Sequence, residues 1–155
     1  MMSYARRAAD AFNMIEEGDV IAVGVSGGKD SVLLLHALAG LSKFYPKHFS
    51  LVAISIDMGM PGVDFSPVTE ACRALGVPHK LVSSRLKEII FDIRKEKNPC
   101  ALCAKMRRGM LHDAAREAGC GKVALGHHFD DAVETFMLSQ VFEGRISCFQ
   151  PVTYL

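Results

Sequence analysis

Two spacings of apolar residues run along the chain and predict its helices and strands. Short apolar runs are typical of buried strands, whereas apolar residues three or four positions apart are typical of helices packed on one face. The runs predict strands over Val20 to Val25, Ser50 to Asp57, His79 to Val82 and Lys122 to Leu125. The wider spacing predicts helices over Ser3 to Ile15, Val32 to Ser42, Phe65 to Leu75, Arg85 to Glu96, Ala101 to Ala118 and Asp130 to Phe142.

Helical segments separate all of the predicted strands. This order is typical of an α/β fold, in which a parallel sheet carries helices on both faces. The ligand of such a sheet lies beyond the carboxyl ends of its strands. The 155 residues, half of them apolar, are enough for one core, so we expect a single domain over 1–155 that begins with a short helix.

Composition points to a protein of the cytoplasm. The sequence has no run of about 18 apolar residues, and its N-terminus (Met1 to Asp10) is polar, so neither a membrane span nor a signal peptide is expected. Five cysteines form no even framework of the kind found in small secreted chains, and we expect no disulfides. The sequence therefore predicts a cytoplasmic protein without a membrane partner.

A glycine-containing loop joins the first predicted strand to the next helix. Its phosphate-binding candidates are Ser26, Gly27, Gly28, Lys29, Asp30 and Ser31. The first turn of a helix has N–H groups without partners and a partial positive charge, so it binds anions. The two glycines let an oxyanion approach the backbone, the serines add hydroxyl donors, the lysine adds a charge, and the aspartate can hold magnesium. The alternative is an ordinary glycine-rich turn.

This loop differs from the Walker P-loop. That motif needs a glycine where Val23 stands and a serine or threonine where Asp30 stands. Transfer of a γ-phosphate is therefore not implied.

At the same sheet edge, Asp57 ends a predicted strand and is placed to bind a ribose or a base, while backbone groups near Ile54 can read the edge of an adenine. The alternative for Asp57 is that it only caps a turn.

A second polar loop, Gly126 to Asp131, follows the last predicted strand. It holds two histidines and two aspartates in five residues, which predicts a metal ion or a phosphate nearby. In the alternative interpretation Asp130 is a helix N-cap, Asp131 interacts with the helix dipole, and His127 or His128 is a satisfied core residue. Both interpretations place this loop beside the glycine loop, because the carboxyl ends of parallel strands meet at one edge.

Charge is unevenly distributed, although the net charge is only +1. Residues 85–108 hold eight basic and three acidic side chains, a net charge of +5, and the rest of the chain carries −4. Such a patch is typical of a polyanion site, and the alternative is a solvated helix face with ion pairs.

The patch contains Cys100 and Cys103, whose spacing lets two thiolates chelate one ion. A closed zinc site from this chain alone is not expected, since no second such pair exists; a redox dithiol is the other alternative.

Together these motifs resemble the PP-loop ATP pyrophosphatase superfamily, whose signature SGGxDS is complete at Ser26 to Ser31. Three more segments are similar to the tRNA 2-thiocytidine synthetase family: Ala11 to Asp19, Cys100 to Cys103 followed by Arg107-Arg108-Gly109, and Gly126 to Asp131. The resemblance spans nearly the whole chain. It implies a Rossmann-like PP-loop domain and ATP-dependent thiolation of a cytidine in the anticodon loop of tRNA.

The resemblance also implies cofactors and roles for single residues. It implies that the Gly126 backbone approaches AMP and that Asp131, with Asp30, serves magnesium binding or catalysis. It places a [4Fe–4S] cluster on Cys100, Cys103 and a third cysteine further downstream. The sequence ends before that cysteine and before the family's next strand, so we expect the C-terminal part to be lacking. Cys148 is an alternative third ligand, although Cys72, Cys120 and Cys148 are expected to be buried thiols.

The resulting hypothesis is adenylation of a cytidine carbonyl at the α-phosphate of ATP, followed by displacement of AMP by sulfur. The glycine loop and His127 would bind the nucleotide, and Arg107 would stabilise phosphate as a catalytic residue. Residues expected to contact tRNA are Lys97, Lys105 and Arg108. Other expected partners are a sulfur donor such as a cysteine desulfurase and a second copy of the chain. The alternatives are 2-thiouridine synthesis, lysidine formation and a non-catalytic ATP-binding module; the CxxC-RRG segment argues against lysidine formation.

Overall fold

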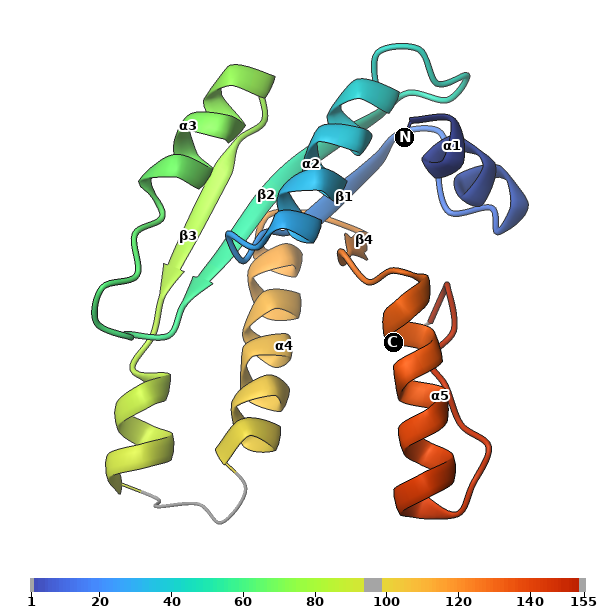
Figure 1. Ribbon diagram of the computed structural model, residues 1–155. Helices are drawn as coiled ribbons and strands as arrows, with labels where there is room; N and C mark the ends of the chain where they lie inside the picture. The colour runs from blue at the N-terminus through green and yellow to red at the C-terminus, as the bar shows by residue number, and fades with distance from the viewer. Residues whose placement is uncertain (1, 94–98, 154–155) are drawn as a thin grey trace.

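The computed structural model describes residues 2–93 and 99–153, which form one parallel sheet with helices around it (Figure 1). The α-helices are α1 (Met2–Ala11), α2 (Lys29–Leu41), α3 (Ser66–Leu75), α4 (Pro99–Glu117) and α5 (Phe129–Glu143). The strands are β1 (Asp19–Gly24), β2 (Phe49–Asp57), β3 (His79–Ser83) and β4 (Lys122–Ala124). A π-helix, η1 (Glu88–Ile93), follows β3. The predicted α/β class with a parallel sheet is confirmed.

Helices cover both faces of the sheet, as the sequence predicts. Alternate residues of the central strand β1 point to opposite faces, because side chains of a strand alternate. Ile21 and Val23 join the core under α1, α2 and α3, whereas Ala22 joins a second core formed with Leu111 of α4. The apolar runs are therefore buried on both faces, which is typical of parallel sheets. None of the described helices combines the length and apolar character that a membrane span requires.

The strand order is β3-β2-β1-β4, so the loops that follow β1 and β4 lie next to each other. From β1 the chain proceeds through α2 to β2 on one side, whereas β4 pairs with β1 on the other side. The order of strands therefore reverses between β1 and β4. Open α/β sheets bind ligands in the crevice beyond the carboxyl ends at such a point.

Several predicted element boundaries differ from the observed ones. The first helix ends at Ala11 instead of Ile15, because Asn13 adopts a left-handed conformation with φ of 48°, which asparagine tolerates better than most residues. The fourth α-helix begins at Pro99, where the missing N–H costs nothing. The predicted helix Arg85 to Glu96 is largely a π-helix over its described part, and its last residues lie outside the described ranges.

The C-terminal helix α5 does not join either core. Ser139 is its one buried residue, and its hydroxyl oxygen lies 2.8–3.0 Å from the carbonyl oxygens of Phe136, Arg145 and Ser147, to one of which it can donate at a time. The segment after α5 thus folds back along the helix instead of onto the sheet (Figure 1). This arrangement leaves Cys148 exposed, so the expectation that its thiol is buried is wrong. Of the other two cysteines expected to be buried, Cys72 is fully buried and Cys120 is only half-buried.

A polar network links the sheet to α3 behind the glycine loop. The buried Ser55 hydroxyl donates to the carbonyl of Val25 at 2.6 Å, so it accepts from Nε2 of His79 at 3.0 Å. The other ring nitrogen, Nδ1, lies 3.0 Å from the Thr69 hydroxyl. A neutral ring with its hydrogen on Nε2 lets Nδ1 accept from the Thr69 hydroxyl, which also lies 3.1 Å from its other acceptor, the Phe65 carbonyl. Burial lowers the pKa of His79, which favours this neutral form.

The network predicts that acid destabilises the fold. Because the folded-state pKa of His79 lies below the unfolded value, the unfolded chain binds more protons as the pH falls through that window. We therefore expect the free energy of unfolding to fall as the pH drops below about 6.5, the ordinary pKa of histidine. Urea unfolding followed by circular dichroism measures this, and His79→Gln should flatten the dependence. The exposed His36, replaced in the same way, serves as the control; an equal flattening there would contradict the assignment.

Candidate nucleotide-binding site and cysteine hollow

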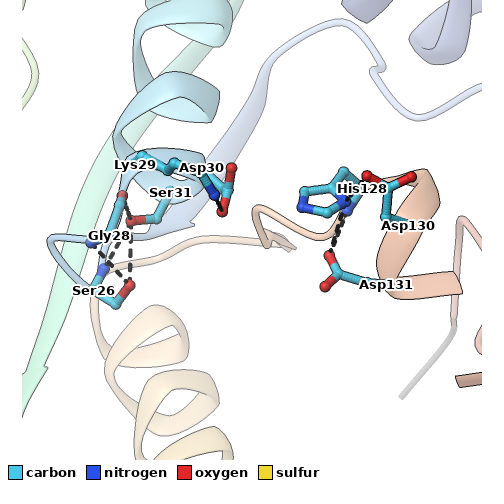
Figure 2. A network of polar contacts seen from close by, with 8 residues as sticks. All are labelled: Ser26, Gly28, Lys29, Asp30, Ser31, His128, Asp130 and Asp131. Atoms are coloured by element: carbon cyan, nitrogen blue, oxygen red, sulfur yellow. Dashed lines mark hydrogen bonds and ion pairs between the residues drawn. The ribbon is translucent and has the colours of Figure 1, made fainter. Parts of the chain in front are cut away.

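The loop between β1 and α2 is a compact turn held by its own serines (Figure 2). The Ser31 hydroxyl donates to the Gly28 carbonyl at 2.8 Å and accepts from the Ser26 N–H at 3.2 Å. The Ser26 hydroxyl accepts from the Gly28 N–H at 3.4 Å. Gly27 has a φ of 85°, a conformation that favours glycine. The turn presents the N-terminus of α2 to solvent beside β1, which suits an anion.

Lys29 and Asp30 form an ion pair at the start of α2. Their Nζ and Oδ2 atoms are 2.9 Å apart, and the Lys29 side chain is 86% exposed. The hydrogen bond from Lys29 holds the pKa of the Asp30 carboxyl below its usual value, and the charge of His128 adds to this effect. The same bond raises the pKa of Lys29. Asp30 is thus an ionised carboxylate at the mouth of the loop, available to a cation that displaces Lys29.

The loop after β4 packs directly against the first turn of α2. A Cβ atom on Gly126 would lie 2.9 Å from the backbone carbon of Asp30 and 2.9 Å from the backbone nitrogen of Ser31. Only a glycine allows this approach, since real Cβ atoms essentially never come so close. The structure therefore joins two of the three predicted loops at the strand-order reversal.

The start of α5 faces the ion pair across this junction (Figure 2). Its N-cap is His128, whose N–H donates to the Asp131 carboxylate at 2.8 Å. The interpretation of Asp130 as the N-cap is therefore wrong; its carboxylate is 79% exposed and lies 4.0 Å from Nδ1 of His128. Asp131 caps the helix from its third position instead, as Glu and Gln do in capping boxes. His127 is exposed and packs on Phe149, with ring centroids 5.2 Å apart, so it is not a core residue.

The third predicted loop, which follows Asp57, makes hydrogen bonds within the protein itself. The carboxylate of Asp57 accepts from the Gly59 N–H at 2.8 Å, which is the turn-capping interaction considered as the alternative. The buried Ile54 offers its carbonyl to the N–H of Val25 at 2.9 Å. Binding of the base or the ribose by Asp57 and Ile54 stays a prediction.

The two cysteines of the basic segment line a hollow of about 250 Å³ at the carboxyl ends of β2 and β3. Its lining residues are Met58, Met60, Lys87, Cys100, Cys103, Ala104 and Arg107. Cys100 is exposed and Cys103 is half-buried, on the first turns of α4. Sequence reasoning counted Lys87 in the basic segment 85–108 but missed both methionines, although Met58 directly follows Asp57 at a strand end and could have been found there.

The described part of the chain brings no histidine, acidic side chain or third cysteine to this pair as a metal ligand. No group of three or more histidine, cysteine or acidic side chains lies close enough to hold a metal in residues 2–93 and 99–153. Cys148 bonds instead to the Ala132 carbonyl on α5, at 3.3 Å, so its role as a third ligand is not supported. Two thiols beside a hollow fit part of an iron–sulfur site. Arg107 lines the hollow, Lys105 and Arg108 are exposed on α4, and Lys97 lies outside the described residues.

An open parallel sheet with an anion-binding glycine loop at its strand-order reversal defines a nucleotide-binding α/β domain. Comparison with known families agrees with this class and refines it. Residues 2–148 match the PP-loop domain family, and the chain belongs to that family. The resemblance noted in the sequence is thereby confirmed.

Curated relatives are named tRNA-cytidine(32) 2-sulfurtransferase. The chain is 44% identical to the protein of Anaeromyxobacter sp. (strain Fw109-5) over 150 residues, which is 94% of this chain and 50% of the relative. It is 43% identical to the protein of Geobacter sulfurreducens over 94% of this chain and 57% of the relative. The chain thus spans about half the length of the curated relatives it matches.

Solved structures agree on the fold. The U34-tRNA thiolase NcsA from Methanococcus maripaludis, determined with its [4Fe–4S] cluster, superposes with a TM-score of 0.77 at 25% identity, covering 94% of this chain and 50% of that one. An NH3-dependent NAD synthetase from Campylobacter jejuni has a TM-score of 0.54 at 14% identity and covers 92% of this chain and 74% of its own, which supports the fold alone.

Proposed function

We propose that this chain is the ATP-binding, cysteine-bearing part of an enzyme that thiolates a cytidine of tRNA. One observation carries the proposal: the glycine loop and the cysteine hollow both lie at the carboxyl edge of one sheet. Relatives named as tRNA-cytidine sulfurtransferases support this substrate. The neighbour with a [4Fe–4S] cluster supports the use of the cysteine pair.

The proposed reaction starts with attack of the cytidine carbonyl oxygen on the α-phosphate of ATP. Pyrophosphate leaves into the glycine loop, where backbone N–H groups and the Ser26 and Ser31 hydroxyls hold it. Asp30 and Asp131 would hold Mg²⁺, which would supply positive charge to the phosphates, since magnesium is usually held by one or two carboxylates plus substrate phosphates. Arg107 stabilises the phosphate charge. Sulfur then displaces AMP from the activated carbon.

The cysteine pair is proposed to serve the transfer of sulfur. Cys100 and Cys103 would hold two corners of a [4Fe–4S] cluster, which when bound supplies the chemistry of sulfur transfer. A sulfur donor such as a cysteine desulfurase is the proposed partner, with the cytoplasm as the proposed location.

We further propose a homodimer, because β4 is an edge strand and α5 exposes Val133, Met137 and Val141.

Mass spectrometry of tRNA nucleosides tests this function. The purified chain is reconstituted anaerobically with iron and sulfide, then incubated with ATP, Mg²⁺, sulfide and unmodified tRNA. We expect 2-thiocytidine that depends on ATP. Appearance of 2-thiouridine would instead support the alternative that the likeness to the U34-tRNA thiolase favours. Failure to bind ATP would contradict the proposal, and saturable ATP binding with neither iron uptake nor any thionucleoside would favour the alternative of a non-catalytic ATP-binding module.

A further inference from the structure

The cysteine hollow contains more sulfur than the proposed function uses. Two thiols and two thioethers line it, together with the cations of Lys87 and Arg107. The proposed function assigns roles to the thiols and Arg107 but none to Met58 or Met60. A thioether is a soft, polarizable ligand, and sets of thiolate and thioether sulfurs select soft metals.

One of the thioethers already contacts a thiol. Sγ of Cys103 and Sδ of Met58 are 3.4 Å apart, and both side chains are partly buried. A thiolate binds a d¹⁰ ion such as Zn²⁺ at about 2.3 Å, so two sulfurs on one ion lie less than about 4.6 Å apart. Three sulfurs placed trigonally around such an ion lie about 4 Å apart, so the observed contact of 3.4 Å, in which the thiol donates to the thioether, must open by about 0.6 Å when an ion enters. Cys100 lies one turn before Cys103 on the same side of α4.

We propose that this hollow binds one Cu(I) ion through the thiolates of Cys100 and Cys103 and the thioether of Met58. Cu(I) accepts a low coordination number and soft ligands, whereas a structural zinc site needs four ligands. Both thiols release their protons to solvent on binding, and the oxidation state of copper does not change. The two thiolates and the ion then carry a formal charge of −1, which the cations of Lys87 and Arg107 face.

Copper binding at this hollow depends on the proposed function only through the cluster. Because copper occupies the same two thiols as the proposed cluster, Cu(I) and the cluster exclude each other. The copper site itself needs neither ATP nor tRNA. Its test therefore gives a result whether or not the chain thiolates tRNA.

Anaerobic titration with Cu(I), delivered from its complex with a chromophoric chelator, tests the site. We expect one Cu(I) per chain. Loss of an outer-shell partner alone lowers metal affinity about 10- to 100-fold, so Met58→Leu, which removes a ligand, should weaken binding at least about tenfold. Met60→Leu is the matched control, because Met60 lines the hollow without the sulfur contact. X-ray absorption should show three sulfurs around copper in the unmodified chain and two in Met58→Leu.

Equal Cu(I) affinity of the unmodified chain and Met58→Leu would overturn the ligand role of Met58, and so would equal weakening in both methionine variants. Circular dichroism verifies that each variant is folded. Iron uptake during reconstitution separates this inference from the proposed function. We expect Met58→Leu to take up iron as the unmodified chain does, and the Cu(I)-loaded chain to take up none. Iron uptake by the Cu(I)-loaded chain would overturn the competition.

Discussion

Replacement of Gly126 by alanine is expected to abolish most of the affinity for ATP. The new methyl carbon would lie 2.9 Å from two backbone atoms of α2, at Asp30 and Ser31. Neither atom can turn away as the end of a flexible side chain can, so the loop after β4 must retract from the first turn of α2. A misplacement of about 1 Å at such a site costs up to about 100-fold. Overpacking of this kind also costs about 1–3 kcal/mol of stability.

Isothermal titration with a non-hydrolysable ATP analogue measures the effect. Gly121→Ala is a matched control, because Gly121 lies just before β4 and a Cβ there meets no atom within 4 Å. We expect the control to bind the analogue as the unmodified chain does. If Gly126→Ala also kept full affinity while remaining folded, the packing of this loop on α2 would not contribute to the nucleotide site.

The glycine loop and its place in the fold were predictable because their signals are local. A buried apolar run, two glycines and a helix start stand consecutively, and each favours the same turn. The joining of Gly126 to Asp30 was also predictable in outline, since parallel strands bring their carboxyl ends to one edge. The close contact that makes Gly126 irreplaceable was not, because it depends on strand register and on the pairing of β4 with β1.

The start of α5 shows where local reasoning failed. Aspartate is a stronger N-cap than histidine, so sequence preference favours Asp130. In the fold, His128 takes the cap position and Asp131 reaches back to its N–H. The cysteine hollow likewise escaped prediction in part. Met58 reaches it from the segment after β2, and no spacing in the sequence links that segment to α4.

Replacement of Cys100 or Cys103 by serine is expected to remove thiolation and to leave ATP binding intact. A serine hydroxyl is a harder and far less acidic ligand than a thiol, so it cannot replace a thiolate on iron. Iron content after anaerobic reconstitution should fall to background in both variants. Formation of thionucleoside should fall at least about 100-fold, as expected when a reaction loses a group on which its chemistry depends.

Cys148→Ser is the control that separates ligand loss from general effects of losing a thiol. Cys148 is exposed on the segment after α5, and its thiol donates to the Ala132 carbonyl, a bond that a hydroxyl can also make. We expect Cys148→Ser to keep iron content and thiolation. Loss of iron in this variant as well would show that Cys148 reaches the cluster after a rearrangement of α5. Full activity of Cys100→Ser would remove the cluster role from the pair and leave the hollow to other chemistry, while the ATP site would stand unchanged.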